Sequence, residues 1–384
     1  MLVKEAVKMR RWAFSLVMLL SLLALAACAA KEEAPASPAA TAAAIPPEWE
    51  QVLAAARKEG KVVVAGPTGA DERKALTEPF ESKYGISVEY LGKTSAEFTT
   101  RILAEREASQ YLWDVFVGGT TPIIPSLTKV GALDPIEPAL ILPEVKDLKN
   151  WNEGRLVFAD KERRILAFLL YTRPSLFLNT SMVKPEEFKS YKDLLDPKWK
   201  GKILVGRDPR VAGPGEATFT FFLMHKDLGP DFIRQLAKQD LTMLRDDRQA
   251  TEWLAEGRYP IVIGVADRFV VDFGRQGLPV TLVDPAKIKE GGDLSPAAGS
   301  VALINRAPHP NAAKVYINWL LSKEGQTEIS KASDRPSWRA DVPRGQLPSW
   351  MKAVPGSIPT FTDEVVIDVR ERQLRPLLEE VFGR

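Results

Sequence analysis

Short apolar runs alternate with amphipathic segments along most of this chain, and this alternation restricts its fold more than any other feature. Residues 61–65 and 86–91 are short apolar runs of the kind found in buried strands. Residues 49–60 and 71–83 carry apolar side chains at helical spacing, and Gly85 follows the second of these segments. Strands separated by helices in this way predict a mostly parallel sheet with helices on both of its faces.

The same pattern restarts in the middle of the chain. Further apolar runs lie at residues 165–171, 201–206, 259–266 and 300–304, and a long helical pattern covers residues 311–322. The folded part has roughly 340 residues, which exceeds the size at which a single core stops growing. The chain is 45% hydrophobic, so two cores of ordinary size are possible. We therefore expect an α/β fold with two lobes, each a mostly parallel sheet flanked by helices.

The N-terminus has the features of a secretory signal that ends at a cysteine. Basic residues precede an apolar run at residues 12–27, and Cys28, the chain's one cysteine, follows it. The sequence Leu25-Ala26-Ala27-Cys28 resembles the bacterial lipobox, which implies removal of residues 1–27 and lipidation of Cys28. An uncleaved anchor would change the attachment but not the compartment. We expect a periplasmic or extracytoplasmic protein held at a membrane, with residues 28–47, rich in alanine and proline, as a flexible tether.

Composition and motifs exclude several classes of function. The 52 basic and 50 acidic residues nearly balance, so no overall field favours nucleic acid. The sequence has no Gly-x-Ser-x-Gly elbow, no His-Glu-x-x-His, no phosphate loop and no Cys-x-x-Cys. We therefore expect neither an enzyme nor a bound cofactor.

Three stretches resemble a known family. Residues 49–65, residues 309–326 and above all the run Asp193-Leu194-Leu195-Asp196-Pro197-Lys198-Trp199-Lys200-Gly201-Lys202-Ile203 are similar to the extracellular solute-binding proteins of ABC importers, in the branch that includes ferric-ion-binding proteins. The resemblance implies two lobes with a ligand cleft between them and closure by a hinge. It also implies a small-molecule ligand, an ABC permease in the inner membrane as partner, and a monomer.

The resemblance also sets boundaries for the parts of the chain. We expect lobe I at residues 48–170 plus 299–340, lobe II at 171–298, and a C-terminal segment, 341–384, that packs on the lobes. The first strand crossing between the lobes should lie near residues 166–179 and the return near residues 298–305.

The candidate ligand contacts follow from the rule that ligands bind beyond the carboxyl ends of strands in such sheets. Glycines there allow close approach of the backbone, and threonines can donate and accept hydrogen bonds. Ordinary turn chemistry explains the same residues, and hinge packing explains the aromatic ring at the crossing. The candidates are Thr68, Gly69, Gly119, Thr120, Tyr171, Arg207, Asp208, Arg210, Gly213, Gly215, Asp267 and Arg268.

An anionic ligand fits these candidates best. The run from Gly213 to Glu216 opens a helix, whose free N–H groups attract anions. Arg207, Arg210 and Arg268 could add bidentate contacts, although each could instead pair with a neighbouring aspartate. A carboxylate, an organophosphate, a ferric chelate and a thiamine-like cation remain open as ligands.

Direct coordination of iron is in doubt at the sequence level. Ferric-binding members of the family use two adjacent tyrosines after the strand that corresponds here to residues 260–266, but this chain has Asp267-Arg268-Phe269 there. Structural roles are favoured for His225 and His309, so no metal site is predicted. The predicted function is capture of a small, anionic solute for an ABC importer. Binding of iron(III) or an iron chelate for ferric uptake, and ligand sensing for a membrane receptor, are the alternatives.

Overall fold

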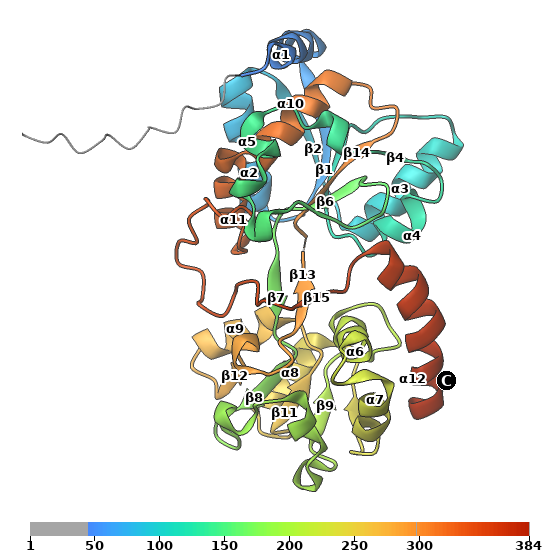
Figure 1. Cartoon of the computed structure of the whole chain (residues 1–384), viewed down its shortest axis with the longest axis vertical. Helices are drawn as coiled ribbons and strands as arrows, with labels where there is room; N and C mark the ends of the chain where they lie inside the picture. The colour runs from blue at the N-terminus through green and yellow to red at the C-terminus, as the bar shows by residue number, and fades with distance from the viewer. Residues whose placement is uncertain (1–44, 297, 384) are drawn as a thin grey trace, which may run out of the picture. The chain divides into compact units, whose positions relative to one another are not determined.

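Two mixed β-sheets organise residues 45–296 and 298–383, the part of the chain that the computed structural model describes (Figure 1). These residues belong to one unit, Ala44–Arg384. The predicted signal peptide, Cys28 and most of the tether lie outside the described residues. None of the described helices is long and apolar enough to cross a membrane.

The first sheet has the strand order β2-β1-β3-β14-β6-β5, with β4 beside β14. Its strands are β1 (Lys61–Gly66), β2 (Ser87–Gly92), β3 (Val115–Gly118), β4 (Leu133–Asp134), β5 (Val157–Phe158), β6 (Ile165–Ala167) and β14 (Ser300–Ile304). β1 is parallel to β2 and β3, whereas β14 is antiparallel to β3, β4 and β6. The prediction that this sheet is mostly parallel is therefore wrong. The chain returns from the second sheet into β14, so β14 runs antiparallel to its neighbours.

The second sheet has the order β10-β9-β11-β8-β12. Its strands are β8 (Leu176–Asn179), β9 (Ile203–Val205), β10 (Thr242–Met243), β11 (Ile261–Ile263) and β12 (Val280–Leu282). β9 is parallel to β10 and β11, and β8 is antiparallel to β11 and β12. This sheet is also mixed and not mostly parallel.

Two short strands carry the chain between the sheets, and a third joins them from the C-terminal region. β7 (Tyr171–Arg173) pairs antiparallel with β13 (Asp293–Ser295), and β15 (Ile358–Pro359) pairs parallel with β13. The first crossing lies where it was predicted. The return lies at β13, before the predicted residues 298–305, because the short run Asp293-Leu294-Ser295 has no strand signal of its own.

The helices cover both sheets. Those associated with the first sheet are α1 (Pro47–Glu59), α2 (Ala70–Tyr84), α3 (Ser95–Glu107), α4 (Ile123–Leu127), α5 (Pro143–Lys146), α10 (Pro310–Leu321) and α11 (Lys323–Ser333). Those associated with the second are α6 (Pro214–Met224), α7 (Gly229–Ala237), α8 (Asp247–Ala255), α9 (Asp267–Arg275), the π-helix η8 (Val365–Leu374) and α12 (Arg375–Phe382). Short 3₁₀ helices connect these elements: η1 (Glu137–Ala139), η2 (Leu148–Asn150), η3 (Asn152–Gly154), η4 (Pro185–Glu187), η5 (Tyr191–Leu195), η6 (Pro197–Trp199) and η7 (Pro285–Lys287).

Local sequence signals explain several helix ends. α1 ends at Gly60, whose φ of 78° lies in the left-handed region that glycine adopts without strain. α3 begins with the predicted capping box, in which the Thr94 hydroxyl accepts the Glu97 N–H and the Glu97 carboxylate accepts the Thr94 N–H. Both predictions are confirmed.

Successive side chains of β11 point to opposite faces of the second sheet, and an apolar cluster covers each face. Ile261 and Ile263 of β11 pack in one cluster with residues of α6, α7 and α12, while Val262 packs in another with residues of α8 and α9. All three side chains are fully buried. Because both faces of this strand are buried, its sequence is continuously apolar and does not alternate between apolar and polar residues.

The C-terminal segment contacts elements of both sheets. Phe361 belongs to the apolar cluster of the first sheet, whereas Leu374, Leu377 and Leu378 belong to a cluster of the second. Figure 1 shows η8 and α12, in red, running along the second-sheet helices α6 and α7.

Candidate functional site

A cavity of about 1090 Å³, called the main cavity below, lies between elements of the first sheet and α9 on the second-sheet side. The first-sheet side contributes Pro67 after β1, Glu72 of α2 and Val117 of β3, and the second-sheet side contributes one face of α9, from Arg268 to Arg275. Residues 327–333 of α11 and the segment that follows this helix complete the wall. The lining residues are Pro67, Glu72, Val117, Phe168, Leu169, Arg268, Val271, Asp272, Arg275, Ala298, Thr327, Ile329, Ser330, Lys331, Ser333, Asp334, Arg335, Pro343, Arg344, Gly345, Gln346, Leu347, Pro348 and Met351.

Cations outnumber carboxylates in this lining, with five against three. Arg275 lies 3.8 Å from Asp272 on the same helix, so that pair is largely balanced. Arg268 is exposed, stacks its guanidinium 4.7 Å from the centre of the Phe269 ring, and forms no ion pair with any described residue. The cavity therefore presents a guanidinium whose charge the protein does not neutralise.

A buried network joins the hinge to this cavity. The Tyr171 hydroxyl on β7 donates to the Asp267 carboxylate at 2.9 Å, and Asp267 opens α9. Arg335, from the segment after α11, lies 3.6 Å from Asp267 and 5.0 Å from the Tyr171 ring centre. Burial raises the pKa of Tyr171 far above its ordinary value, so its hydroxyl stays protonated and serves as a donor. These three side chains link three segments of the chain: β7, the start of α9 and the segment after α11.

A second cavity of about 230 Å³ lies between the end of β3 and the N-terminus of α6. It contains the predicted contacts Gly119, Thr120 and Gly213. Two buried ion pairs line it as well, Arg173 with Asp293 at 2.9 Å and Arg370 with Glu216 at 3.1 Å. Its buried charges therefore sum to zero.

The N-terminus of α6 already faces a carboxylate of the protein. Glu216 lies in the first turn of this helix, and burial raises its pKa while the Arg370 guanidinium opposes that rise. Gly215 is needed for close packing, because a Cβ there would lie 1.8 Å from the Arg207 carbonyl oxygen. The Glu216 carboxylate therefore already interacts with the positive end of this helix dipole, and this weakens the predicted attraction for an external anion.

The arginines predicted after β9 are paired with aspartates. Arg207 donates to Asp247 at 2.9 Å, and Arg210 donates to Asp208 at 2.8 Å and to the Gly383 carbonyl at 2.9 Å. None of these five residues lines a cavity described above. Pairing with an aspartate is the alternative to ligand contact that sequence analysis left open for these arginines.

The remaining candidates are distributed as follows. Thr68 is exposed and Gly69 caps the start of α2, and neither lines the two cavities. Asp267 and Arg268 were predicted to lie in a loop, but they form the first turn of α9. Tyr171 and Asp267 do not line the main cavity themselves, but both contact Arg335, which does. As ligand contacts, all twelve residues stay predictions.

Metal-binding chemistry is sparse in the part of the chain that the structure describes. No group of three or more His, Cys, Asp or Glu side chains there is arranged to hold an ion. His309 contacts the buried Asp114 at 2.8 Å through Nδ1, and His225 accepts the Asp227 N–H at 3.2 Å. Both histidines therefore have structural contacts.

Sequence reasoning missed the segment that closes one side of the main cavity. Lys331, Arg335 and Arg344 line it, yet Lys331 lies in the last turn of α11 and the two arginines follow that helix, so none of them follows a strand. The search was limited to loops after strands, so nothing pointed to them.

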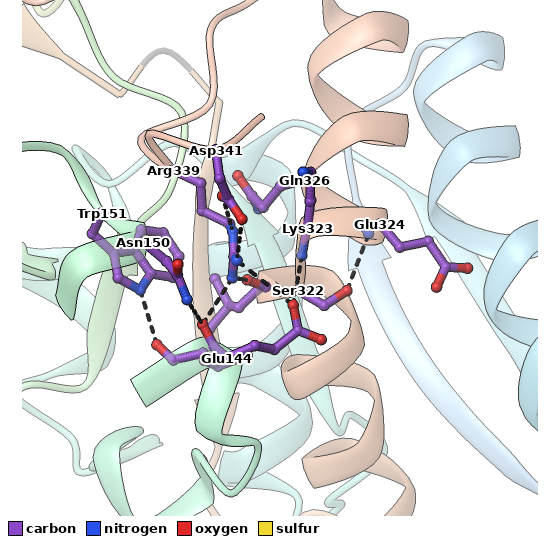
Figure 2. Close-up of polar contacts among 12 residues, drawn as sticks. Glu144, Asn150, Trp151, Ser322, Lys323, Glu324, Gln326, Arg339 and Asp341 are labelled. Atoms are coloured by element: carbon purple, nitrogen blue, oxygen red, sulfur yellow. Dashed lines mark hydrogen bonds and ion pairs between the residues drawn. The ribbon is translucent and has the colours of Figure 1, made fainter. Parts of the chain in front are cut away.

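This segment is held by a buried arginine that Figure 2 shows at its start. Arg339 is 2% exposed and donates to the carbonyls of Leu321 at 3.0 Å and Glu144 at 3.1 Å. Asp341 accepts from the same guanidinium at 2.8 and 2.9 Å. Arg339 therefore holds the segment that follows α11 to elements on the first-sheet side.

Comparison with known proteins places these features in one family. A model of bacterial extracellular solute-binding proteins matches residues 75–356. Iron uptake protein A1 of Synechocystis is 25% identical over 290 residues, covering 70% of this chain and 73% of that protein.

Two solved structures share the fold. Trichodesmium IdiA (FutA), in complex with iron and citrate, has a TM-score of 0.65 and 18% identity over 85% of this chain and 100% of that one. The periplasmic binding protein AfuA of Actinobacillus pleuropneumoniae, with fructose-6-phosphate bound, has a TM-score of 0.57 and 19% identity over 84% of this chain and 98% of that one.

The family and the two-lobed α/β fold expected from the sequence are thus confirmed, as is the role of binding a solute for an ABC transporter outside the cytoplasm. The chain belongs to the bacterial extracellular solute-binding proteins.

Proposed function

We propose that the solute is a small organic anion, and that it binds in the main cavity while the lobes close on it. The observation that carries this proposal is the lining itself, where five cations face three carboxylates and Arg268 has no ion pair among the described residues. A guanidinium without a protein partner can bind a carboxylate or phosphate through two parallel hydrogen bonds. Such contacts are stronger inside a cavity than in bulk water.

The lobes of this proposal are residues 48–170 plus 299–340 and residues 171–298, joined at β7 and β13. Residues 341–384 pack on both. The network of Tyr171, Asp267 and Arg335 supports a hinge here, because it joins β7 to the wall of the main cavity. Closure is favoured only if the solute binds the closed form more tightly than the open one.

The second cavity has a different role in this proposal. Gly119, Thr120 and Gly213 remain proposed contacts, for an uncharged polar part of the solute, because the charges around them are already paired. Arg207 and Arg210 are weaker candidates, since each already donates to an aspartate. Thr68, Gly69, Asp208 and Gly215 have no contact with either cavity that supports a role.

Attachment and partners complete the proposal. Cys28 carries a lipid, the tether lets the folded part reach a permease in the inner membrane, and the protein acts as a monomer without catalysis. The basic start, the apolar run and the position of the cysteine support the lipid anchor. Ligand sensing for a membrane receptor is the alternative use of the same binding event.

Uptake of chelated iron is the second candidate function. The Trichodesmium protein is similar in fold and holds iron with citrate. A citrate chelate can bring its own oxygen ligands to the metal, so it does not need the adjacent tyrosines, which this chain lacks at Asp267-Arg268-Phe269. A cationic cavity suits such an anionic chelate.

Native mass spectrometry of protein purified without refolding tests the proposal. We expect the wild-type protein to carry a small acid and Arg268→Ala to carry much less of it. Titration calorimetry with the released solute should show a loss of ~1.5–3 kcal/mol for Arg268→Ala, about ten- to 150-fold in affinity. Equal occupancy and affinity in the two proteins would remove the proposed site.

A further inference from the structure

One loop, residues 342–351, supplies much of the wall of the main cavity. It contributes Pro343, Arg344, Gly345, Gln346, Leu347, Pro348 and Met351 to the lining. The loop begins just after the buried Arg339 anchor in Figure 2 and ends at Met351, which is 4% exposed. It is therefore fixed at both ends while its centre faces the cavity.

The same loop also reaches the second sheet. Trp350 lines a cavity of about 300 Å³ together with Val270 and Val271 of α9 and Leu282 of β12. Its ring also lies edge-on to the hinge residue Tyr171, with 6.3 Å between the ring centres. The loop thus borders a cavity with α9, which carries Arg268, although its anchor lies on the first-sheet side.

Arg344 is the charged residue that this loop presents. Its Nη2 donates to the carbonyl of Pro348 at 3.2 Å and to that of Met351 within the same loop. No described carboxylate pairs with it, so its remaining N–H groups and its charge are available to the cavity. Those two carbonyl contacts restrict the side chain before any ligand binds, which lowers the entropy lost on binding.

Arg268 and Arg344 therefore bring two guanidinium groups without carboxylate partners into one cavity, from different segments of the chain. Building on the proposed function, we propose that Arg344 is a specificity-determining residue and that the cavity selects solutes with two or more separate anionic groups. Di- and tricarboxylates are the simplest members of this class. A solute with one anionic group can satisfy one of the two arginines and leaves the other without a partner.

Titration calorimetry with butyrate, succinate and citrate as probes tests this inference on wild-type protein, Arg344→Gln and Arg268→Gln. Arg372→Gln is the matched control, because Arg372 is exposed on η8 and does not line the main cavity. Arg344 lies in an exposed loop, so we expect Arg344→Gln to fold normally. An unchanged thermal midpoint checks this.

We expect the wild type and the control to bind succinate and citrate more tightly than butyrate. Arg344→Gln should weaken the binding of succinate and citrate by about tenfold or more, the scale of a lost charge-assisted hydrogen bond, and should change butyrate binding little. If Arg344→Gln leaves the preference intact while Arg268→Gln weakens every probe, the inference is wrong and the proposed function stands. If the wild type binds none of the three probes, or binds butyrate as tightly as citrate, the inference is wrong, whereas the proposed function is decided by the native mass spectrometry of wild type and Arg268→Ala.

Discussion

Replacing Arg370 with alanine should be among the most destabilising single changes outside the apolar core. Arg370 lies on η8 in the C-terminal segment, and only 6% of the residue is exposed. Its guanidinium contacts Glu216 at 3.1 Å, the Thr220 hydroxyl at 3.2 Å and the Thr360 carbonyl at 2.7 Å. Alanine removes all three contacts at once.

Arg370→Ala should lower the free energy of unfolding mainly because it leaves the buried Glu216 without its partner. Removing one partner of a buried ion pair costs ~3–5 kcal/mol, because the other charge remains buried without compensation. Glu216 is that charge, and burial already raises its pKa. Because Glu216 can take up a proton when Arg370 is absent, the loss of stability should be larger at pH 8 than at pH 5.

Urea denaturation followed by circular dichroism measures this cost, with Arg372→Ala as the control on the same helix. Arg372 is 72% exposed and pairs with the exposed Asp368, so its removal should cost about 0–1 kcal/mol. The double variant Glu216→Gln/Arg370→Met removes both charges and should be more stable than Arg370→Ala. Equal free energies of unfolding for Arg370→Ala and Arg372→Ala would refute this reasoning.

Three further predictions concern the hinge, the pH dependence and the anchor. Tyr171→Phe removes the hydrogen bond to the buried Asp267 and should lower stability by ~1–3 kcal/mol; an unchanged thermal midpoint would contradict that role. Burial and the neighbouring Glu364 raise the pKa of Asp363 to about 6, above its ordinary value of 3.8, so the folded state holds this proton more tightly than the unfolded state. Stability should therefore fall as the pH rises from about 4 to 6, and Asp363→Asn should reduce that fall in denaturation midpoints measured across this range. Cys28→Ala should abolish labelling with a radioactive fatty acid and release the protein from the membrane fraction, and retained label would rule out the lipid anchor.

Local signals made the regular elements predictable from the sequence. α1 ends at Gly60 because glycine adopts the left-handed conformation found there without strain. α3 begins at Thr94 because the side chains of Thr94 and Glu97 cap its first turn. These features depend only on neighbours along the chain. The strand β13 has no such signal, because Asp293 and Ser295 take strand conformation through pairing with β7, more than a hundred residues earlier.

The site was harder to predict for the same physical reason. Arg207 looked available for a ligand, but its partner Asp247 lies forty residues away and becomes its neighbour only in the folded chain. Arg344 was not considered, because its place in the cavity depends on the Arg339 anchor, which contacts carbonyls of residues 144 and 321 only in the folded chain. Arg268 could be found, since it follows a strand in an α/β lobe.

Closure of the two lobes on the solute is the central claim, and the distance between spin labels on opposite lobes tests it most directly. Labels at Glu107→Cys on α3 and Arg248→Cys on α8 occupy exposed positions, in a version of the chain that begins at Ala29 and so lacks Cys28. Pulsed electron resonance should show a shorter distance when the solute found by native mass spectrometry is added at saturation. An unchanged distance distribution at saturation would contradict the account.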